Sequence, residues 1–181
     1  MKGIKKKGGA KMFSEVFGEK IEGFYDVNLR EAIRAVIIKG DKLLMIKTNR
    51  GDIKFPGGGK EKGESDEETL IREVREEAGY DVERIIEKMG TVTEQHFDKY
   101  EKEKIFKMVS TYYLCEVKEE KKLQKLDEYE KRLGFEAIEI DIDEAIERNE
   151  IVINEVGNEG WVFREWVVLQ KLKDEYLVNK V

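Results

Sequence analysis

Short hydrophobic runs predict two strands in the first third of the chain. Residues 32–38 are rich in β-branched side chains, and residues 42–46 form a second apolar run. The segment between them, Lys39-Gly40-Asp41, has the composition of a tight hairpin turn. We therefore expect both runs to belong to one sheet.

A helix is predicted from Ser65 to Ala78. Ser65 is a favoured N-cap residue, and Glu68 three positions later completes a capping box. Gly79 follows directly, and glycine is favoured just past a helix end. Apolar side chains recur at helical spacing and predict a buried stripe: Leu70, Ile71, Val74 and Ala78.

The second half of the chain predicts further strands and then helices. Strands are expected at residues 82–93, 105–117 and 135–140, with a charged loop at 95–104 and a polar segment containing a helical turn at 118–132. A short helix is expected from Asp141 or Asp143 to Arg148, and a final helix is expected after an N-cap at Asn158. The core side of that final helix is predicted to carry Trp161, Trp166, Leu169 and Leu172. This order predicts an α/β sandwich with a mixed sheet between helices.

The length of 181 residues fits one domain. We interpret residues 1–25 as an N-terminal tail and lead-in, mobile over about the first dozen residues, and residues 26–181 as the domain. Nowhere are there 18 consecutive apolar residues, so no membrane span is expected.

The charge and the rare residue types exclude several classes of function. A net charge of −6 argues against a general nucleic-acid binder, although local cations can still bind a small anionic substrate. Cys115 is the single cysteine, so no intrachain disulfide can form, which fits a cytoplasmic location. His96 is the single histidine and has no second histidine or cysteine with which to build a zinc site.

Three glutamates on the predicted helix are candidates for metal binding. Glu73, Glu76 and Glu77 lie within about a third of a turn of one another, so their carboxylates share one face. A divalent cation relieves the repulsion between them, and all-oxygen ligands select Mg²⁺ or Mn²⁺. The glycines at 57–59 let backbone groups approach a ligand closely. The alternative is a solvated acidic face with no ligand.

Residues 58–80, GGKEKGESDEETLIREVREEAGY, resemble the Nudix box of the MutT-like hydrolases. The box is written G-x5-E-x7-R-E-U-x-E-E-x-G-U, where U is a bulky aliphatic residue. The matching positions are Gly58, Glu64, Arg72, Glu73, Val74, Glu76, Glu77 and Gly79. Tyr80 departs from the pattern, at a position that is expected to pack in the core.

The resemblance implies a Nudix-type α/β/α sandwich and a Mg²⁺- or Mn²⁺-dependent hydrolase. Such enzymes cleave the pyrophosphate of a nucleoside diphosphate linked to another group. The metal ligands implied are Glu73, Glu76, Glu77 and the carbonyl of Gly57. Arg72 and Glu64 are expected to form an ion pair that orients the metal ligands.

The general base is left open between Glu73 and a glutamate on a later loop. Glu128 and Glu130 are the loop candidates, and Glu130 is preferred because it directly precedes structured residues. Phosphate contacts could come from Arg50, Lys54 and Lys60, although each alone is also typical of a surface cation.

The substrate is predicted only as a small nucleotide-type molecule. Pro56 is the only proline, so the later proline associated with ADP-ribose hydrolases is absent, and the tyrosine of dinucleoside polyphosphate hydrolases is absent too. His96 and Phe97 occupy that region and could contact a base. The alternative function is an inactive Nudix-type nucleotide or metabolite sensor, and the sequence allows a homodimer.

Overall fold

The computed structural model describes residues 4–6, 12–101, 103–157 and 160–179. Its main feature is an eight-stranded mixed sheet whose order is β2-β7-β8-β3-β4-β5, with β6 paired to β3 and β9 paired to β4. The strands are β2 (Phe13–Gly18), β3 (Asp26–Lys39), β4 (Lys42–Lys47), β5 (Ile53–Lys54), β6 (Gly57–Gly59), β7 (Tyr80–Phe97), β8 (Lys104–Lys121) and β9 (Glu136–Ile140). A separate pair joins β1 (Ile4–Lys6) to β10 (Leu177–Asn179).

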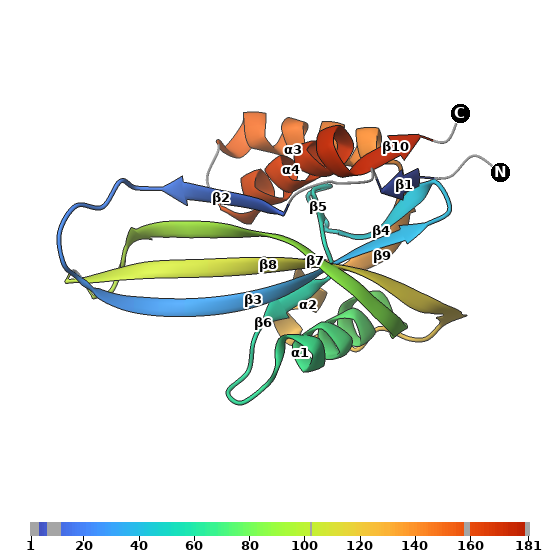
Figure 1. Cartoon of the computed structure of the whole chain (residues 1–181), viewed down its shortest axis with the longest axis horizontal. Helices are drawn as coiled ribbons and strands as arrows, with labels where there is room; N and C mark the ends of the chain where they lie inside the picture. The colour runs from blue at the N-terminus through green and yellow to red at the C-terminus, as the bar shows by residue number, and fades with distance from the viewer. Residues whose placement is uncertain (1–3, 7–11, 102, 158–159, 180–181) are drawn as a thin grey trace.

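Helices cover both faces of the sheet, as the sequence predicts (Figure 1). One side carries α1 (Asp66–Glu73), which continues into a π-helical turn at Val74–Ala78, and the short α2 (Glu128–Arg132). The other side carries α3 (Ile142–Val156) and α4 (Trp161–Lys171), with a π-helical turn at Leu172–Tyr176. The fold is therefore an α/β/α sandwich.

The second half of β3, residues 32–38, is a nearly unbroken apolar run that packs on both faces of the sheet. Val36 belongs to the core under α3 and α4, whereas Ile33, Ala35 and Ile37 belong to the core under α1. Successive strand residues point to opposite faces, and both faces of this part of the sheet are covered by helices. The predicted hairpin is confirmed, because β3 pairs antiparallel with β4 across Gly40.

The helix that follows the glycine-rich turn begins and ends as predicted. Ser65 and Glu68 form both hydrogen bonds of a capping box, and Gly79 ends the helical segment at φ 76°. Leu70, Val74 and Ala78 are fully buried, whereas Ile71 of the predicted stripe is 42% exposed. Tyr80 is 5% exposed, so the residue that departs from the box packs in the core as expected.

The predicted charged loop at 95–104 is too long at both ends, because β7 continues to Phe97 and β8 begins at Lys104. β7 and β8 are 18 residues each and pair from Tyr80↔Lys121 to Phe97↔Ile105. Beyond the helices the strand ends form an arm (Figure 1). Its residues are exposed along the first part of β3 and mostly partly buried along the ends of β7 and β8. Polar side chains can stay in contact with water there, which removes the hydrophobic alternation that identifies a strand.

The segment before Asp26 contributes more structure than the sequence indicated. β2 pairs in parallel with β7, and Phe13 is 5% exposed against Tyr112, with ring centroids 5.7 Å apart. A strand this short with a distant parallel partner has no local signal. Residues 1–3 and 7–11 of the expected tail lie outside the described residues.

The C-terminal helices differ from the prediction in length and in burial. Asp141 caps α3 as expected, but the helix continues past Arg148 to Val156. Asn158 lies outside the described residues, and α4 begins after Gly160. Leu169 and Leu172 are buried as predicted, whereas Trp161 and Trp166 remain partly exposed. In the part of the chain that is described, no helix is long and apolar enough to cross a membrane.

The packing of β2 gives a direct test of its structural role. We expect Phe13→Ala to lower the free energy of unfolding by about 3 kcal/mol, because it opens a cavity beneath Tyr112. Phe24→Ala is the control, since Phe24 is fully exposed. Chemical denaturation measures both, and equal stabilities would contradict the assignment of β2 to the core.

Candidate active site

Strand β6 and helix α1 meet at a corner that only glycine permits. Gly57 has φ 144°, and a Cβ there would overlap the backbone carbonyl of Ile33. A Cβ on Gly58 would overlap the carboxylate of Glu73 on α1. The glycines therefore bring the β6 backbone against the acidic side of the helix.

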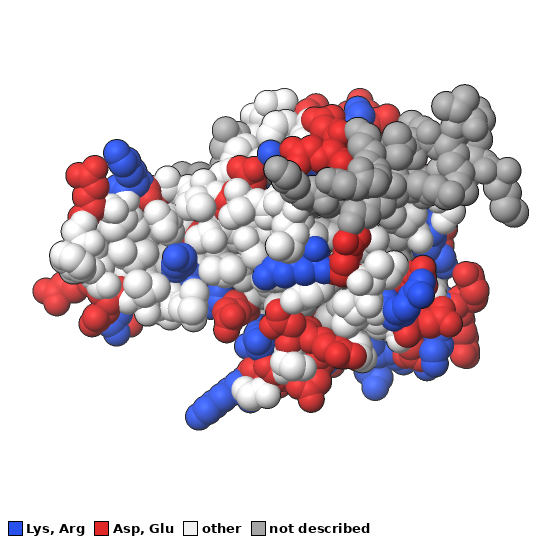
Figure 2. All heavy atoms as spheres, in the orientation of Figure 1, with Lys and Arg blue, Asp and Glu red and all other residues white. Residues whose placement is uncertain are grey.

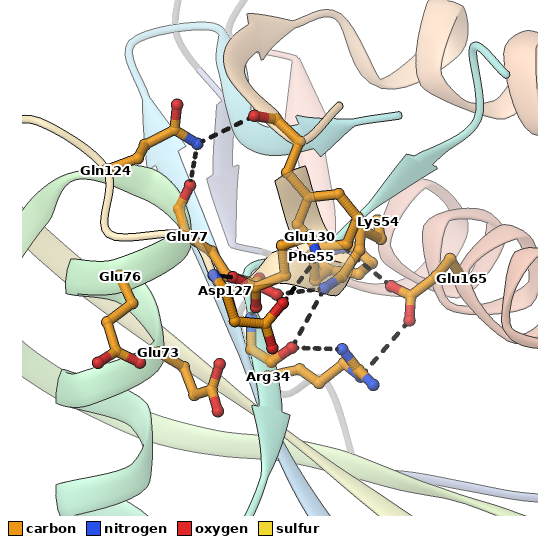
Figure 3. Close-up of polar contacts among 12 residues, drawn as sticks. Arg34, Lys54, Phe55, Glu73, Glu76, Glu77, Gln124, Asp127, Glu130 and Glu165 are labelled. Atoms are coloured by element: carbon orange, nitrogen blue, oxygen red, sulfur yellow. Dashed lines mark hydrogen bonds and ion pairs between the residues drawn. The ribbon is translucent and has the colours of Figure 1, made fainter. Parts of the chain in front are cut away.

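Three carboxylates converge at this corner. Glu73, Glu77 and Glu130 each offer an oxygen within 4.8 Å of the others. Glu73 and Glu77 are buried, at 7% and 2% exposed, and Glu130 from α2 is partly buried (Figure 3). Buried like charges at this separation require a cation or a proton between them.

A lysine supplies one such cation. Lys54 is 8% exposed, and its ammonium lies 2.5 Å from an oxygen of Glu77 and 3.3 Å from the Gly57 carbonyl. It also lies 4.4 Å above the ring of Phe135. The second oxygen of Glu77 accepts the Gly57 N–H at 2.9 Å. Glu77 is therefore held from both sides by groups of β5 and β6.

Glu73 holds its proton more tightly than a carboxyl group in water, because it is buried close to Glu77. Burial, and then the nearby Glu77 carboxylate, raise the pKa of Glu73 to about 7. Burial also raises the pKa of Glu130. A divalent cation would have to displace the Glu73 proton, so its binding should strengthen as the pH rises through about 7.

Arg72 connects the cluster to the preceding loop, as the sequence predicts. Its guanidinium binds both oxygens of Glu64, at 2.7 and 2.8 Å, and holds the pKa of that carboxyl down at about 2. The same guanidinium donates to Glu73 at 2.7 Å and to the Gly59 carbonyl at 3.1 Å. Arg72 thus orients Glu73 and the glycine turn together.

The structure separates the predicted residues into two groups. Glu76 lies outside the three-carboxylate cluster, with its nearest cation Arg72 at 3.5 Å, and Glu128 points to solvent beside Lys131 (Figure 3 for Glu76). Arg50 pairs with Asp52, and Lys60 pairs with Asp66. Of the three predicted phosphate-binding cations, the structure brings only Lys54 to the cluster.

The acidic residues at the start of α1 differ from Glu73 and Glu77 in their exposure to solvent. The first turn of α1 contains Asp66, Glu67 and Glu68, and acidic side chains gather over this helix on the face drawn in Figure 2. These residues of the first turn are largely solvated, which is the alternative that the sequence left open for Glu73, Glu76 and Glu77. Glu73 and Glu77 lie past them along the helix and are buried.

Several residues that sequence reasoning missed line the same cleft, whose volume is about 540 Å³. They are Arg30, Ala32, Arg34, Met108, Tyr129, Trp161 and Arg164. A signal did exist in β3, where Arg30, Ala32 and Arg34 alternate on one face, with Ala32 and Arg34 opposite Gly59 and Gly57. Recognising it required knowing that β6 pairs with β3.

A buried ion network holds the cleft from the α4 side. Arg34 donates to the Gly57 carbonyl at 2.8 Å and lies 3.6 Å from Glu165. Glu165 also binds Arg164 and accepts the Phe55 N–H at 3.0 Å (Figure 3 for Arg34 and Glu165). The backbone of β5 and β6 is therefore anchored to α4 by charge-assisted hydrogen bonds.

His96 and Phe97, which could have contacted a base, do not line the cleft. His96 stacks on Phe106 with centroids 5.0 Å apart, and Phe97 packs against Tyr25. These contacts belong to the arm.

The donor set fits a hard divalent cation. Carboxylate oxygens of Glu73, Glu77 and Glu130 converge, and a buried ammonium already lies among them. The Gly57 carbonyl lies beside the same ammonium and faces two cationic donors, Lys54 and Arg34. Oxygen ligands of this kind favour hard divalent cations.

Comparison with known proteins gives a family match over a range that contains the three carboxylates. The NUDIX domain family model matches residues 28–156. A NUDIX hydrolase from Nitrosomonas europaea superposes with a TM-score of 0.54 at 21% identity, covering 82% of this chain and 93% of that one. A MutT NUDIX hydrolase from Burkholderia pseudomallei gives 0.47 at 22% identity, covering 64% and 85%. No curated protein matches the sequence.

The Lys54–Glu77 pair predicts a large loss of stability when it is broken. Lys54→Met leaves Glu77 buried without its cation, which should cost about 3–5 kcal/mol and lower the melting temperature by roughly 10 °C. Lys47→Met is the control, because Lys47 pairs with Glu136 at the surface. Mg²⁺ should raise the melting temperature of Lys54→Met, and the absence of any rescue would contradict a cation site at Glu77.

The raised pKa of Glu73 predicts a pH-dependent stability in chelator. The folded pKa of about 7 lies above the unfolded value, so ionised Glu73 destabilises the fold increasingly from about pH 4.5 to pH 7. Glu73→Gln should therefore raise the melting temperature at pH 8 by on the order of 5 °C more than at pH 5. A stabilisation that is the same at both pH values would show that Glu73 does not titrate in this range.

Proposed function

Because the chain belongs to the Nudix family of hydrolases, we propose that it is a Mg²⁺- or Mn²⁺-dependent pyrophosphohydrolase acting on a nucleoside diphosphate linked to another group. The observation that carries the proposal is the convergence of Glu73, Glu77 and Glu130 within 4.8 Å beside the glycine turn. The complete set of acidic residues supports a hydrolase rather than an inactive sensor.

We assign Glu73 and Glu77, with the Gly57 carbonyl, as residues that would hold the metal. Glu76 remains a candidate for a further ion, because it lies one helical turn from Glu73. The metal supplies neutralisation of the pyrophosphate charge and polarisation of the attacking water. Arg72 orients Glu73, and Arg34 orients the Gly57 carbonyl.

Glu130 is proposed as the group that accepts a proton from the attacking water. It belongs to the carboxylate cluster, lies in the cleft, and has a raised pKa that suits a general base. Glu73 is the competing candidate, but its contact with Arg72 and its place beside Gly58 suit a metal ligand better. Lys54 is proposed to contact the substrate phosphate when the metal neutralises Glu77.

The function is tested by a phosphate-release screen over nucleotide sugars, ADP-ribose, dinucleoside polyphosphates and nucleoside triphosphates. A coupled phosphatase reveals phosphomonoester products, and each reaction is run with Mg²⁺ and with chelator. We expect at least one substrate to be cleaved in the presence of Mg²⁺ and not in chelator. Glu77→Gln should lower the turnover of that substrate by at least about a hundredfold. Binding of nucleotides without any cleavage would favour the sensor instead.

Two glutamates on α2 form a matched pair for the base assignment. Glu130→Gln should lower turnover by about a hundredfold, whereas Glu128→Gln should leave it unchanged. Glutamine at position 130 can still close the capping box with Asp127, so α2 should stay folded. Equal turnover in the two variants at saturating Mg²⁺ would return the role of base to Glu73.

A further inference from the structure

The cleft continues beyond the carboxylate cluster into a second region, which we call the outer cleft. It is lined by Arg30 on β3, Met108 on β8 and Trp161 on the first turn of α4. None of these residues belongs to the box or to the carboxylate cluster. A substrate whose pyrophosphate lies beside Glu73 and Glu77 must extend in some direction, and the outer cleft is continuous with that site.

Strand register brings the three side chains to the same place. Arg30 pairs with Met108, and Met108 pairs with Glu94 on the next strand, so their side chains share one face of the sheet. Glu94 binds Arg164 at 2.5 Å. Trp161 lies one helical turn before Arg164 and therefore emerges beside it, above this row.

Two members of the outer cleft have unused binding capacity. Arg30 is exposed and makes no hydrogen bond or ion pair with any described residue, and Trp161 has neither a ring partner nor an indole hydrogen bond there. Arg34 and Arg164, the other arginines of the cleft, are buried and already paired with Glu165. The free groups are thus an indole and a planar guanidinium beside a thioether.

We propose that the outer cleft binds the nucleobase of the nucleoside diphosphate substrate, with the base stacked on Trp161 and Arg30. An indole face, a guanidinium plane and a polarisable thioether all bind flat π-systems favourably. A site for the phosphates would instead need several converging free cations. The proposal rests on the proposed function for the placing of the pyrophosphate, and it identifies the nucleoside as the part of the substrate bound at this end.

Metal-free binding tests this proposal separately from catalysis. Trp161 and Trp166 are the only tryptophans, and Trp166 packs on Phe163 away from the cleft. Trp166→Phe therefore leaves Trp161 as the single tryptophan, whose emission is read with excitation that tyrosine does not absorb. In chelator, AMP should quench this fluorescence, whereas ribose 5-phosphate, which lacks the base, should not. Binding of radiolabelled AMP by equilibrium dialysis gives an independent affinity for proteins without Trp161.

Dialysis then compares variants. Trp161→Leu should weaken AMP binding by about tenfold, and Arg30→Met should weaken it by several fold. Arg84→Met is the matched control and should bind AMP normally, because Arg84 lies outside the cleft beside Glu116. Equal affinity for AMP and ribose 5-phosphate, or unchanged AMP affinity in Trp161→Leu, would overturn the proposal.

The two proposals can fail independently. If the substrate screen finds Mg²⁺-dependent cleavage but Trp161→Leu leaves both KM and AMP binding unchanged, the outer cleft is not the base site and the proposed function stands. If no substrate is cleaved but AMP binds through Trp161, the base site stands and the hydrolase proposal fails. When both hold, Trp161→Leu should raise KM for the substrate with little change in kcat.

Discussion

The burial of several carboxylates around one lysine is the constraint on which the rest of the site depends. Glu73 at the end of α1 and Glu77 in the π-helical turn after it are buried, and Lys54 compensates only part of their charge. A cluster of this kind is costly unless a cation or a proton completes it. Burial, and then the neighbouring Glu77 carboxylate, raise the pKa of Glu73, and a divalent ion at this corner would relieve both effects.

Around this corner, two arginines that form ion pairs also donate hydrogen bonds to backbone carbonyls of β6. Arg72 reaches the carbonyl of Gly59, and Arg34 reaches the carbonyl of Gly57. One arginine comes from the helix beneath the sheet and the other from β3, where it is tied to α4 through Glu165. Both helical layers are therefore linked through these arginines to the three-residue strand β6. A substitution in α4 that displaces Arg34 would move the Gly57 backbone and, with it, the position of the carboxylates.

The parts of the site that could be predicted from sequence are those that local spacing determines. The capping box at Ser65, the shared face of Glu73 and Glu77, and the pair between Arg72 and Glu64 all follow from positions within one helix and its loop. Arg30 could not be found in this way, because its neighbours are set by the pairing of β3 with β6 and β8. Within the arm, residues 26–31 of β3 and 94–97 of β7 were missed, because strand residues in contact with water need no apolar alternation.

The parallel pairing of β2 with β7 and of β3 with β8 also affects the order in which the strands can assemble. Phe13 of β2 meets Gly90 of β7, and Asp26 of β3 meets Lys104 of β8, so each contact closes a loop of many residues. Long loop closures are entropically slow, whereas β7 and β8 are joined by a short connection and can pair locally. The long hairpin is therefore suited to form early and to serve as the template on which β2 and β3 assemble, which would make the arm a folding nucleus rather than an appendage.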